Sequence, residues 1–505
     1  MQNNSPGLLL LTGFQVFRKM EPSLTQVEPT AYHWLKKYFK LPPTEEQDAL
    51  FHELRDFIEK EGDTKATFIL KGYAGTGKTT VIQAVAKTVR KYGYRTVLLA
   101  PTGRATKVLA KYSKRKAYTI HRQIYKQVQH PYSGNIEFKL RKNYQKRAVF
   151  MVDEASMISH EEDGGDKRNA ARTILMDLLE YVFEHPHNKL IIIGDKAQLP
   201  PVGQSLSVAL NAEILEHAYG LTVSEFELTQ VVRQQKRKGI LRNATTLRKI
   251  LLAETLLEHL ETQPYDDIYR MQSSKLKQGL SYAYLKYGLK QTILICASNQ
   301  EATRYNQRIR KEILHRQQQV EVGDMLMVVR NNYRVLPKSS NVGFLANGEF
   351  VEVVEVQEEE DKYGFHFLTL QLKLPDHPRQ PPFISKVITK TLQSSSPTLT
   401  SEENKLLYDA ISTQYEDIPQ KSKQLKAIRK DPYLNALQVK FAYALTCHKA
   451  QGGQWPIVFV DPGYLKRQSQ HHAESRPEVI RWLYTACTRA TQELYLIDLP
   501  SNFFK

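Results

Sequence analysis

A glycine-rich segment near the start of the chain has the spacing of a phosphate-binding loop. Residues 72–79 read Gly-Tyr-Ala-Gly-Thr-Gly-Lys-Thr and lie between an apolar run and an amphipathic stretch. Glycines let backbone N–H groups close around phosphates, and a following helix N-terminus adds partial positive charge. Lys78 is then placed to contact the β- and γ-phosphates, and Thr79 to bind Mg²⁺. The residues predicted to surround the phosphates are Gly72, Gly75, Thr76, Gly77, Lys78, Thr79 and Thr80.

Two acidic residues follow another strongly apolar run, 148–152. Beside a phosphate loop, Asp153 is placed to hold Mg²⁺ through water, and Glu154 to polarise the attacking water. Paired acids at a strand end can also cap the next helix, but the phosphate loop favours the hydrolytic interpretation. A third apolar run leads to Gln198, which is placed to bridge the γ-phosphate and a neighbouring domain. From these residues alone we predict a Mg²⁺-dependent ATPase or GTPase.

Short apolar, β-branched runs must position these motifs. Such runs, alternating with helical stretches, are typical of a buried parallel sheet and an α/β class, with ligands at the carboxyl ends of the strands. The runs are Thr67–Leu70, Thr96–Ala100, Ala148–Asp153, Leu190–Asp195, Thr292–Ala297, Val439–Leu445, Ile457–Asp461 and Leu494–Asp498. Residues 122–147 contain a turn signal between polar flanks and predict a β-hairpin insertion. Alternating apolar stretches within 321–395 predict a small all-β barrel.

Positive charge is concentrated in one part of the chain. The net charge is +18, and residues 104–147 hold 13 Lys and Arg against a single acid, Glu137. Aromatic residues are interleaved with these cations, which suits phosphates and unstacked bases. A solvated basic face with core tyrosines fits the composition equally well.

The remaining composition excludes several classes of protein. The three cysteines form no CxxC pair, so neither a disulfide framework nor a thiolate zinc site is indicated. No apolar run approaches the roughly 18 residues that a membrane span needs. The basic stretch also lacks the amphipathic face of a membrane-surface helix. We expect a cytoplasmic protein with a polyanionic partner and no membrane association.

Further segments of the chain resemble the motifs of superfamily 1 helicases of the RecD, Dda and Pif type. They follow the order of that family and span nearly the whole chain. Among these segments, LLAPTGRAT (98–106) resembles motif Ia, and ALTCHKAQGGQ (444–454) resembles motif V. Motif V departs from the family at Gly453 and Gln454, where many relatives have a small polar residue and an acid. The matching segments are PTEEQ (43–47), GYAGTGKTT (72–80), LLAPTGRAT (98–106), YTIHR (118–122), VDEAS (152–156), GDKAQLPPVG (194–203), LTQVVRQ (228–234), ALTCHKAQGGQ (444–454) and YTACTRA (484–490).

The resemblance implies an α/β fold with two RecA-like domains in tandem, a β-hairpin inserted in the first and a β-barrel in the second. ATP binds between the two domains in this family. We expect the Ser-, Gln- and Lys-rich residues 396–432 to be mobile. The expected divisions are an N-terminal segment (1–29), the first domain (30–204, with the hairpin at about 122–147), the first part of the second domain (205–320), the barrel insertion (321–432) and the rest of the second domain (433–505).

The resemblance also implies roles around the nucleotide. Gln47 would read adenine, which favours ATP over GTP. Arg233 and Arg489 would reach the γ-phosphate from the second domain and neutralise transition-state charge. Gln451 and Gly452 would couple contact with the nucleic-acid strand to the nucleotide state. The implied catalytic set is Lys78, Asp153, Glu154, Gln198, Arg233 and Arg489, with Thr79 and Asp153 at Mg²⁺ and Gly452 added to the ATP site.

By the same resemblance, motifs Ia and V would line the path of single-stranded DNA. Hydroxyls and backbone amides at these positions suit phosphates and carry no sequence information. On the hairpin, Tyr132 or Phe138 would stack on the last base pair and separate the strands, although a tip or core aromatic fits these positions as well. The implied DNA-binding residues are Pro101, Thr102, Arg104, Thr106, Thr119, His121, Tyr132, Phe138, Thr446, His448 and Lys449.

The sequence and the resemblance together predict an ATP-dependent DNA helicase that moves along single-stranded DNA, in the 5′-to-3′ direction by resemblance, and acts as a monomer at single-strand/duplex junctions. Three alternatives stay open: a translocase that does not separate strands, an RNA helicase, and a nucleic-acid-binding regulator switched by ATP.

Overall fold

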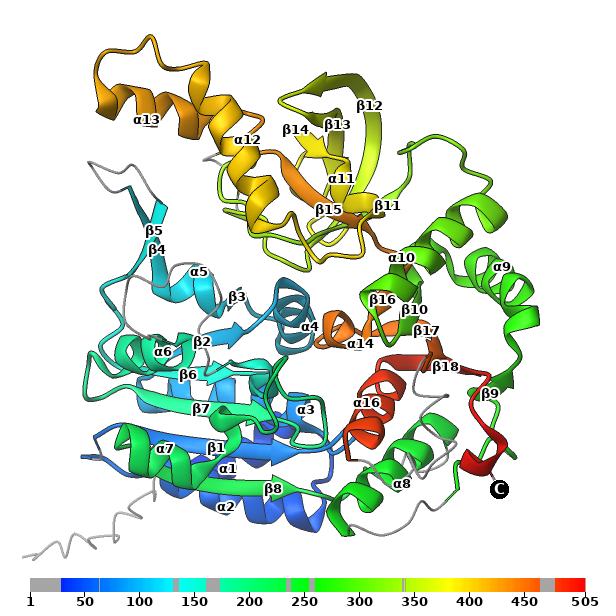
Figure 1. Cartoon of the computed structure of the whole chain (residues 1–505). Coiled ribbons are helices and arrows are strands. Elements are labelled where there is room, and N and C mark those ends of the chain that lie inside the picture. Colours follow the sequence, from blue (N-terminus) through cyan, green and yellow to red (C-terminus); the bar gives the residue numbers. More distant parts are fainter. Residues whose placement is uncertain are drawn as a thin grey trace, which may run out of the picture.

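The chain folds into two α/β lobes with a β-barrel beside the second (Figure 1). The computed structural model describes residues 29–62, 64–129, 136–159, 173–232, 238–253, 259–337, 340, 342–463 and 477–504. The predicted fold class, two parallel-sheet domains with a hairpin and a barrel inserted, is confirmed.

The first lobe is built on six parallel strands in the order β3-β2-β6-β7-β1-β8. Its interior strands are buried on both faces, as their continuous apolar sequences predict. Ile69 pairs with Ile192, so strands β1 and β7 end at the same edge of the sheet and their following loops are neighbours. The strands are β1 (Ala66–Gly72), β2 (Arg95–Ala100), β3 (Ala117–Thr119), β6 (Ala148–Val152), β7 (Lys189–Gly194) and β8 (Thr222–Leu228).

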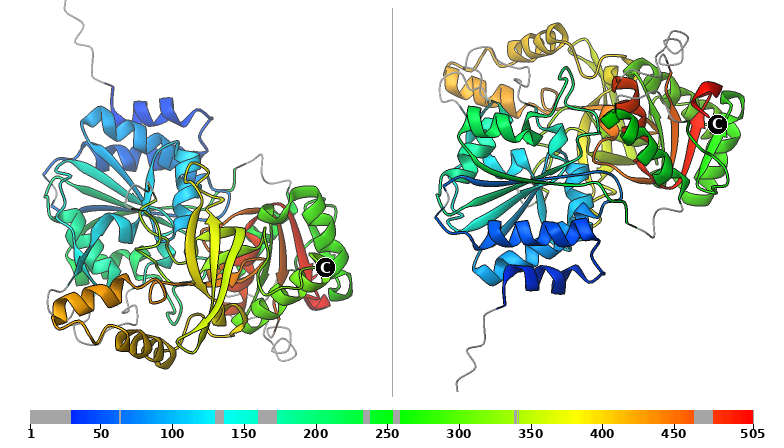
Figure 2. Two further views of the ribbon diagram at one scale, coloured as in Figure 1. Left: turned by 90° about the horizontal axis from the view of Figure 1, so that it is seen from above. Right: turned by 90° about the horizontal axis from the view of Figure 1, so that it is seen from below.

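Helices cover both faces of this sheet (Figure 2). Alternate strand residues point to opposite cores: Phe68 and Leu70 pack with α1 to α4, and Ile69 packs with α5 to α7. The helices are α1 (Ala31–Phe39), α2 (Glu45–Glu59), α3 (Lys78–Thr88), α4 (Gly103–Ser113), α5 (Ile120–Ile124), α6 (Ile174–Phe183) and α7 (Ala212–Tyr219), with 3-10 turns η1 (Val89–Tyr92), η2 (Ala155–Met157) and η3 (Val208–Leu210).

Strand β8 corrects the expected boundary between the domains at residue 204. It pairs in parallel with β1 along its whole length, from Ala66↔Thr222 to Gly72↔Leu228. As an edge strand it is largely exposed, and only Leu228 at its end is buried. The polar sequence of β8 therefore does not resemble the buried runs from which the other strands were predicted.

The predicted hairpin projects from the first lobe as an antiparallel pair, β4 (Tyr125–Gln129) and β5 (Ile136–Leu140). The turn between them, including Tyr132, lies outside the described residues, and so does the side chain of Phe138. Placement of either aromatic at a strand junction therefore stays a prediction.

The second lobe has five parallel strands in the order β16-β10-β17-β18-β9. They are β9 (Ile268–Met271), β10 (Thr292–Cys296), β16 (Ala444–Thr446), β17 (Trp455–Asp461) and β18 (Ala490–Ile497). The helices around them are α8 (Gly239–Ala253), α9 (Leu276–Tyr287), α10 (Asn299–Arg308), α14 (Cys447–Ala450) and α16 (Pro477–Cys487), with short turns η5 (Ser273–Lys275), η6 (Leu289–Gln291), η7 (Ile309–Ile313) and η10 (Ser501–Phe503).

The barrel closes through five strands, β11 (Met325–Val328), β12 (Phe350–Lys362), β13 (Phe365–Lys373), β14 (Phe383–Ile388) and β15 (Leu437–Phe441). Its last strand lies beyond the expected limit at residue 432. The apolar run 439–445, predicted as one strand, is two: β15 completes the barrel and β16 belongs to the second lobe. The chain thus leaves the barrel and enters the lobe within a few residues.

Residues 396–432, which we expected to be mobile, form two helices beside the barrel, α12 (Ser401–Thr413) and α13 (Lys421–Lys430), after the short α11 (Lys390–Gln393). A capping box at Thr400 and Glu403 starts α12. Leu407 and Ile411 of α12 and Ile428 of α13 pack on Phe367 of the barrel. The expectation was wrong because few apolar residues, widely spaced, suffice to anchor these helices.

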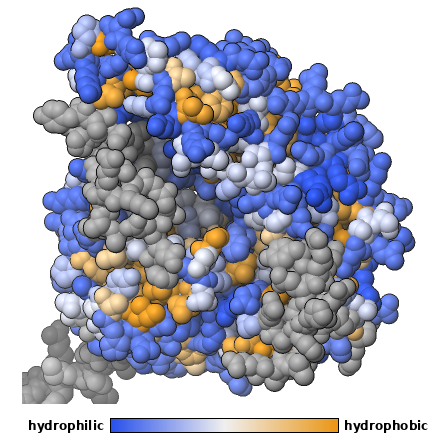
Figure 3. Space-filling view, in the orientation of Figure 1, coloured by the Kyte–Doolittle hydropathy of each residue, from blue (hydrophilic) through white to orange (hydrophobic). Residues whose placement is uncertain are grey.

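The apolar residues gather in the cores of the lobes and barrel. The face turned to the viewer in Figure 3 is mostly hydrophilic, with hydrophobic residues in small patches. Within the described residues, no helix combines the length and the apolar character that crossing a membrane requires.

Candidate functional site

The glycine-rich loop joins the end of β1 to the start of α3. Gly75 and Gly77 have φ angles of 81° and 89°, a left-handed region that favours glycine. At Gly77, an added Cβ would lie 2.6 Å from the Nε2 atom of Gln47. The ammonium group of Lys78 donates to the carbonyl oxygens of Gly72 (2.5 Å) and Tyr73 (2.9 Å). The lysine therefore lies inside the loop, where phosphates would bind.

Gln47 contacts this loop directly. It begins α2 with Thr44 in a capping box, and its Oε1 accepts from the Thr44 backbone N–H at 3.0 Å. Its Nε2 donates to the carbonyl oxygen of Thr76 at 3.0 Å, and only 2% of the residue is exposed. The predicted neighbourhood of Gln47 and the phosphate loop is therefore present, while adenine recognition stays a prediction.

The acidic pair follows β6 at the same edge of the sheet. Asp153 accepts from the backbone N–H of Glu154 at 2.9 Å. Burial and the adjacent charge of Glu154 raise the pKa of Asp153, and Lys78 acts in the opposite direction. Glu154 itself has a φ of 53°, a costly conformation for a residue with a side chain and one that concentrates at functional sites. These features fit a carboxylate that binds a cation during catalysis.

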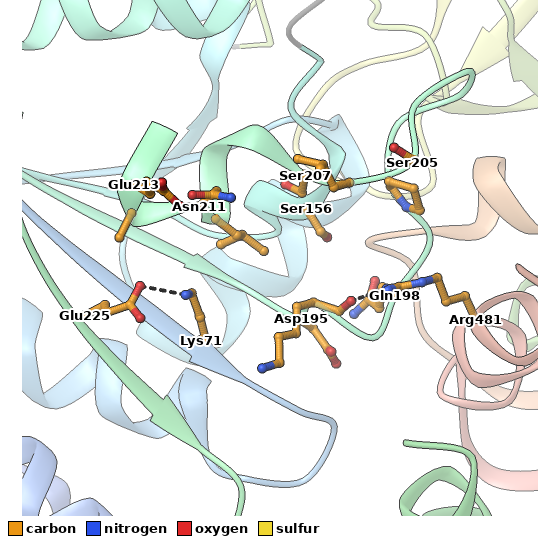
Figure 4. Close-up of a pocket in the computed structure, with 15 residues that line it drawn as sticks. Lys71, Ser156, Asp195, Gln198, Ser205, Ser207, Asn211, Glu213, Glu225 and Arg481 are labelled. Atoms are coloured by element: carbon orange, nitrogen blue, oxygen red, sulfur yellow. Dashed lines mark hydrogen bonds and ion pairs between the residues drawn. The ribbon is translucent and has the colours of Figure 1, made fainter. Parts of the chain in front are cut away.

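Gln198 lies beside a hollow of about 410 Å³ at the edge of the nucleotide site (Figure 4). It is 6% exposed, and its Oε1 has no hydrogen-bond partner among the described residues. The buried hydroxyl of Ser156, on the same hollow, also has none there. Unpaired buried polar atoms are costly, so the carbonyl of Gln198 is available to a water or a phosphate.

Hydrogen bonds cross from the second lobe to the nucleotide site. The hydroxyl of Tyr484, on α16, accepts from the backbone N–H of Ala74 at 2.9 Å and donates to Asp195 at 2.6 Å. At the next residue, the Thr485 hydroxyl accepts from the Leu199 N–H at 2.9 Å. None of these three contacts was predicted, because nothing in the sequence pairs residues 286 to 410 positions apart.

The two predicted arginines differ in what the structure shows. Arg489 is 4% exposed, and its guanidinium donates within its own lobe, to Thr485 O (3.0 Å), Gly453 O (3.3 Å) and the Thr488 hydroxyl (3.1 Å). It is thus held beside the interface rather than in the phosphate loop. Arg233 lies outside the described residues.

The segment before Arg233 touches the loop directly, because the Val232 N–H donates to Gly75 O at 3.2 Å. A further arginine, which the motifs do not mark, also meets the loop. Arg248 on α8 lies 4.6 Å from the ring centre of Tyr73, which is within cation–π range. The second lobe therefore approaches the phosphate loop at several points.

A second hollow, of about 340 Å³, lies between the two lobes and the barrel, and we call it the channel. It brings together predicted DNA-binding residues from both lobes, separated by more than 300 positions in the chain. Barrel residues that motif reasoning missed, Asn331, Phe344 and Asn347, complete its wall. The predicted residues that line it are Pro101, Thr102, Arg104, Thr119, His121, His448 and Lys449, together with Gln451.

Among the predicted DNA-binding residues whose side chains the structure describes, two do not line the channel. Thr106 is buried within α4, and its hydroxyl donates to Gly103 O at 2.5 Å. Thr446 occupies the N-cap position of α14 without a side-chain capping hydrogen bond, and it borders a small adjoining cavity that Lys449 also lines. For Thr106 in particular, the structure supports a role in the helix rather than at a phosphate.

Arg104 borders the channel, but its guanidinium stacks between two rings. It lies 3.9 Å from the ring centre of Phe350 in the barrel and 4.2 Å from that of Trp455 in the second lobe. Burial lowers the pKa of Arg104 to about 10. Arg104 therefore joins the first lobe to both other parts, a role its place in motif Ia does not predict.

The glycines of motif V lie against the motif Ia helix. A Cβ at Gly452 would lie 2.9 Å from the Ala105 Cβ, and the residue has a φ of 69°. Gly452, predicted at the ATP site, is therefore placed on the channel side of the lobe interface. A Cβ at Gly453 would lie 2.5 Å from the Trp455 ring. The departure from the family pattern at Gly453 thus makes room for this tryptophan.

We predict that single-strand binding weakens as pH rises through the titration of Lys449. Burial lowers its pKa to about 8, so the ammonium is charged below that pH and neutral above it. A phosphate contact would therefore be lost on the alkaline side, by about three- to tenfold between about pH 7 and about pH 9. Dissociation constants measured across this range, for the wild type and for Lys449→Arg, check the prediction.

The arginine variant should bind with little change over the same range, because its charge persists. A second buried lysine, Lys440, titrates over the same pH range and must be distinguished from Lys449. Burial and the charge of Lys449 lower its pKa to about 8 as well, but its ammonium donates to Thr391 O and Ser394 O. An identical pH profile in both proteins would contradict the assignment to Lys449.

Two family models match the chain. An AAA domain model matches residues 55–258, and a UvrD-like helicase C-terminal domain model matches residues 441–497. The first covers the phosphate loop and the acidic pair. The second covers the motif V segment that lines the channel, and α16 with the following turn that carries Arg489. The two matches therefore fall on the two lobes whose interface forms the site.

Named relatives give the same picture. The ATP-dependent RecD2 DNA helicase of Deinococcus radiodurans is 31% identical over 179 residues, 35% of this chain and 21% of the relative. The ATP-dependent DNA helicase dda of Enterobacteria phage T4 is 30% identical over 193 residues, 38% of this chain and 39% of the relative. In both cases the match thus spans well under half of the relative's length.

Among solved structures, the Pif1 helicase from Bacteroides in complex with ADP-AlF3 and single-stranded DNA is similar over 92% of this chain and 95% of its own, with 16% identity and a TM-score of 0.45. The two family models and the two named relatives agree with the motif order along the chain. The chain therefore belongs to the superfamily 1 helicases of the RecD, Dda and Pif type.

Proposed function

We propose that this protein is an ATP-driven DNA helicase that translocates along single-stranded DNA held in the channel. The observation that carries the proposal is the channel itself, where motif Ia and motif V residues from two lobes meet. The first of these lobes also carries a complete phosphate loop. The polar side chains on the channel wall include hydroxyl, amide, imidazole and ammonium groups, which suit phosphates without reading sequence. The aromatic ring of Phe344 on the barrel side offers a stacking face for a base.

The nucleotide would be ATP with Mg²⁺. A hydroxyl from Thr79 and a carboxylate from Asp153 are the hard oxygen ligands that Mg²⁺ prefers when phosphates supply the rest of its shell. When bound, the ion neutralises charge developing on the phosphates. Glu154 then orients and deprotonates the attacking water, and Lys78 holds the β- and γ-phosphates in place.

Movement would arise because one element touches both sites. Gln451 lines the channel, and its Nε2 donates to Leu199 O at 2.7 Å, next to Gln198 at the nucleotide site. Closure of the lobes on ATP changes the position of motif V relative to motif Ia, where Gly452 packs on α4. Alternating closure and opening then gives directed steps because each nucleotide state favours one grip on the strand. By family resemblance the direction is 5′-to-3′.

The test is ATP hydrolysis by the purified protein with no nucleic acid, with single-stranded DNA and with single-stranded RNA. We expect strong stimulation by DNA, and the Glu154→Gln protein, purified in parallel, excludes a contaminating ATPase. Strand separation is then followed on duplexes with a 5′ or a 3′ tail. Binding of DNA without stimulated ATP hydrolysis would contradict the proposed ATP-driven translocation. Stimulation by RNA alone would indicate that the protein moves along RNA. Stimulation by DNA without strand separation would indicate a translocase that does not unwind duplexes.

A further inference from the structure

A third hollow, of about 460 Å³, lies at the side of the first lobe and shares no lining residue with the channel or with the hollow beside Gln198. It opens where β2 and β3 begin, and we call it the edge groove. Arg90 follows α3, Arg95 starts β2, and Arg115 and Lys116 form the turn before β3. Uncharged side chains, among them Tyr118, complete the lining. Four cations and no carboxylate therefore face one concave surface.

The cations of the edge groove lack counter-charges. None of the four forms an ion pair with a carboxylate of the described residues. Burial and the neighbouring charge of Arg90 lower the pKa of Arg115. Close by, burial and three cations, Lys40, Arg115 and Lys114, lower the pKa of Lys87. Cations that repel one another around a hollow are stabilised when an anion binds there. Such a hollow therefore attracts an anionic ligand more strongly than an exposed face whose cations are freely solvated.

The edge groove and the channel adjoin. Strand β3 is the edge of its sheet, and consecutive residues of one segment face the two hollows. Thr119 and His121 line the channel, whereas Tyr118 and Gln123 line the edge groove. Gln145, which follows β5, also lines the groove, so the groove lies at the foot of the hairpin. A nucleic acid at the hairpin would therefore have a basic surface on the far side of the edge strand.

We propose that the edge groove binds the phosphodiester backbone of a second DNA segment, outside the channel, at the junction where strands separate. The inference rests on the proposed helicase function. Guanidinium groups suit phosphates because they are planar, always charged and able to donate two bonds at once. Repeated phosphates match a row of cations spread over three elements. The segment is either the duplex ahead of the hairpin or the strand that is displaced from the duplex and stays outside the channel. Both present the same phosphodiester backbone.

The test compares direct binding of three DNA molecules: a single strand, a duplex carrying that strand as a 5′ tail, and the same duplex with an unpaired 3′ tail added. The variant is Arg90→Glu with Lys116→Glu, because both side chains are exposed and their replacement leaves the half-buried Arg115 intact. The matched control is Lys275→Glu with Lys277→Glu, two exposed lysines near the start of α9 on the second lobe, which gives the same change in net charge.

We expect the variant to bind the single strand as the wild type does and to lose about tenfold in affinity for a junction, with the slope of log affinity against log salt smaller by about 2. If the variant already loses affinity for the duplex with the 5′ tail alone, the groove binds the duplex. If it loses affinity only when the 3′ tail is present, the groove binds the displaced strand. Unchanged affinity for all three molecules would overturn the proposal. So would equal losses on all three, or equal losses in the control variant.

The outcome separates from that of the proposed function. Direct binding needs no ATP hydrolysis, whereas failure of the motor would appear as hydrolysis that single-stranded DNA does not stimulate. Thermal unfolding of the variant, recorded beside the wild type, shows that a loss of binding is not a loss of fold. A groove that served an acidic protein instead would leave all three DNA affinities unchanged, which counts against the proposal.

Discussion

Replacing Glu154 with glutamine is expected to lower kcat for ATP by about 10²- to 10⁴-fold, the contribution typical of a positioned general base. Glutamine preserves the shape and hydrogen-bonding capacity of the side chain and removes its charge and basicity. Binding of ATP and of single-stranded DNA should persist, because Lys78, Thr79 and Asp153 are unchanged. Removing the negative charge beside Asp153 also relieves the like-charge repulsion that raises the pKa of Asp153.

Single-turnover hydrolysis and equilibrium ATP binding, measured on the same preparation, check this expectation. The matched control is Glu216→Gln, a change of the same type at an exposed position of α7, outside the acidic pair and outside the hollow beside Gln198. Its kcat should stay within about twofold of the wild type, as surface substitutions usually do. A Glu154→Gln protein that hydrolyses ATP at nearly the wild-type rate would show that another group activates the water.

The nucleotide site was predictable from sequence because its parts are local. A phosphate loop must follow a strand and precede a helix, and residues 66–88 supply all three in order. The acidic pair is likewise fixed by the end of a buried strand. The buried strands were found because both of their faces are apolar, whereas the exposed edge strand β8 has no such signature.

Contacts between distant parts of the chain were not predictable. The partners of Arg104 are Phe350 and Trp455, which are 246 and 351 positions away, and no local pattern marks any of the three as a stack. Tyr484 illustrates the same limit, because its contact with Ala74 depends on how two lobes dock. The family resemblance supplied the approximate location of the lobe interface, and the structure supplied the atoms that form it.

These long-range contacts connect the predicted nucleotide site with the predicted single-strand channel. Tyr484 touches the phosphate loop, and Gln451 touches both the channel and the segment that carries Gln198. A change in the separation of the lobes must therefore alter both sites together. A rigid connection of this kind suits coupling of hydrolysis to movement, because packed interfaces shift between discrete arrangements rather than deforming smoothly.

The same interface determines what is expected of Arg489. Replacing it with alanine should lower kcat by about 10³-fold or more, the loss typical of a missing arginine at the γ-phosphate. The KM for ATP should change little, because the residue is held within the second lobe and would contact the nucleotide on closure. Three acceptors, Thr485 O, Gly453 O and the Thr488 hydroxyl, hold its guanidinium in place. Lysine should not restore activity, because an ammonium group cannot satisfy these acceptors and reach the phosphate together.

Arg481→Ala is the matched control for this prediction. Arg481 lies on α16, eight residues before Arg489, and crosses the interface to donate to the backbone carbonyl of Lys196, but its contact is exposed. We expect its kcat to fall by less than about fivefold, since exposed contacts contribute little. Steady-state kinetics of both variants, with unfolding curves to exclude loss of the lobe, decide the matter. An Arg489→Ala enzyme no slower than Arg481→Ala would remove Arg489 from the reaction and leave it a structural residue of the turn between α16 and β18.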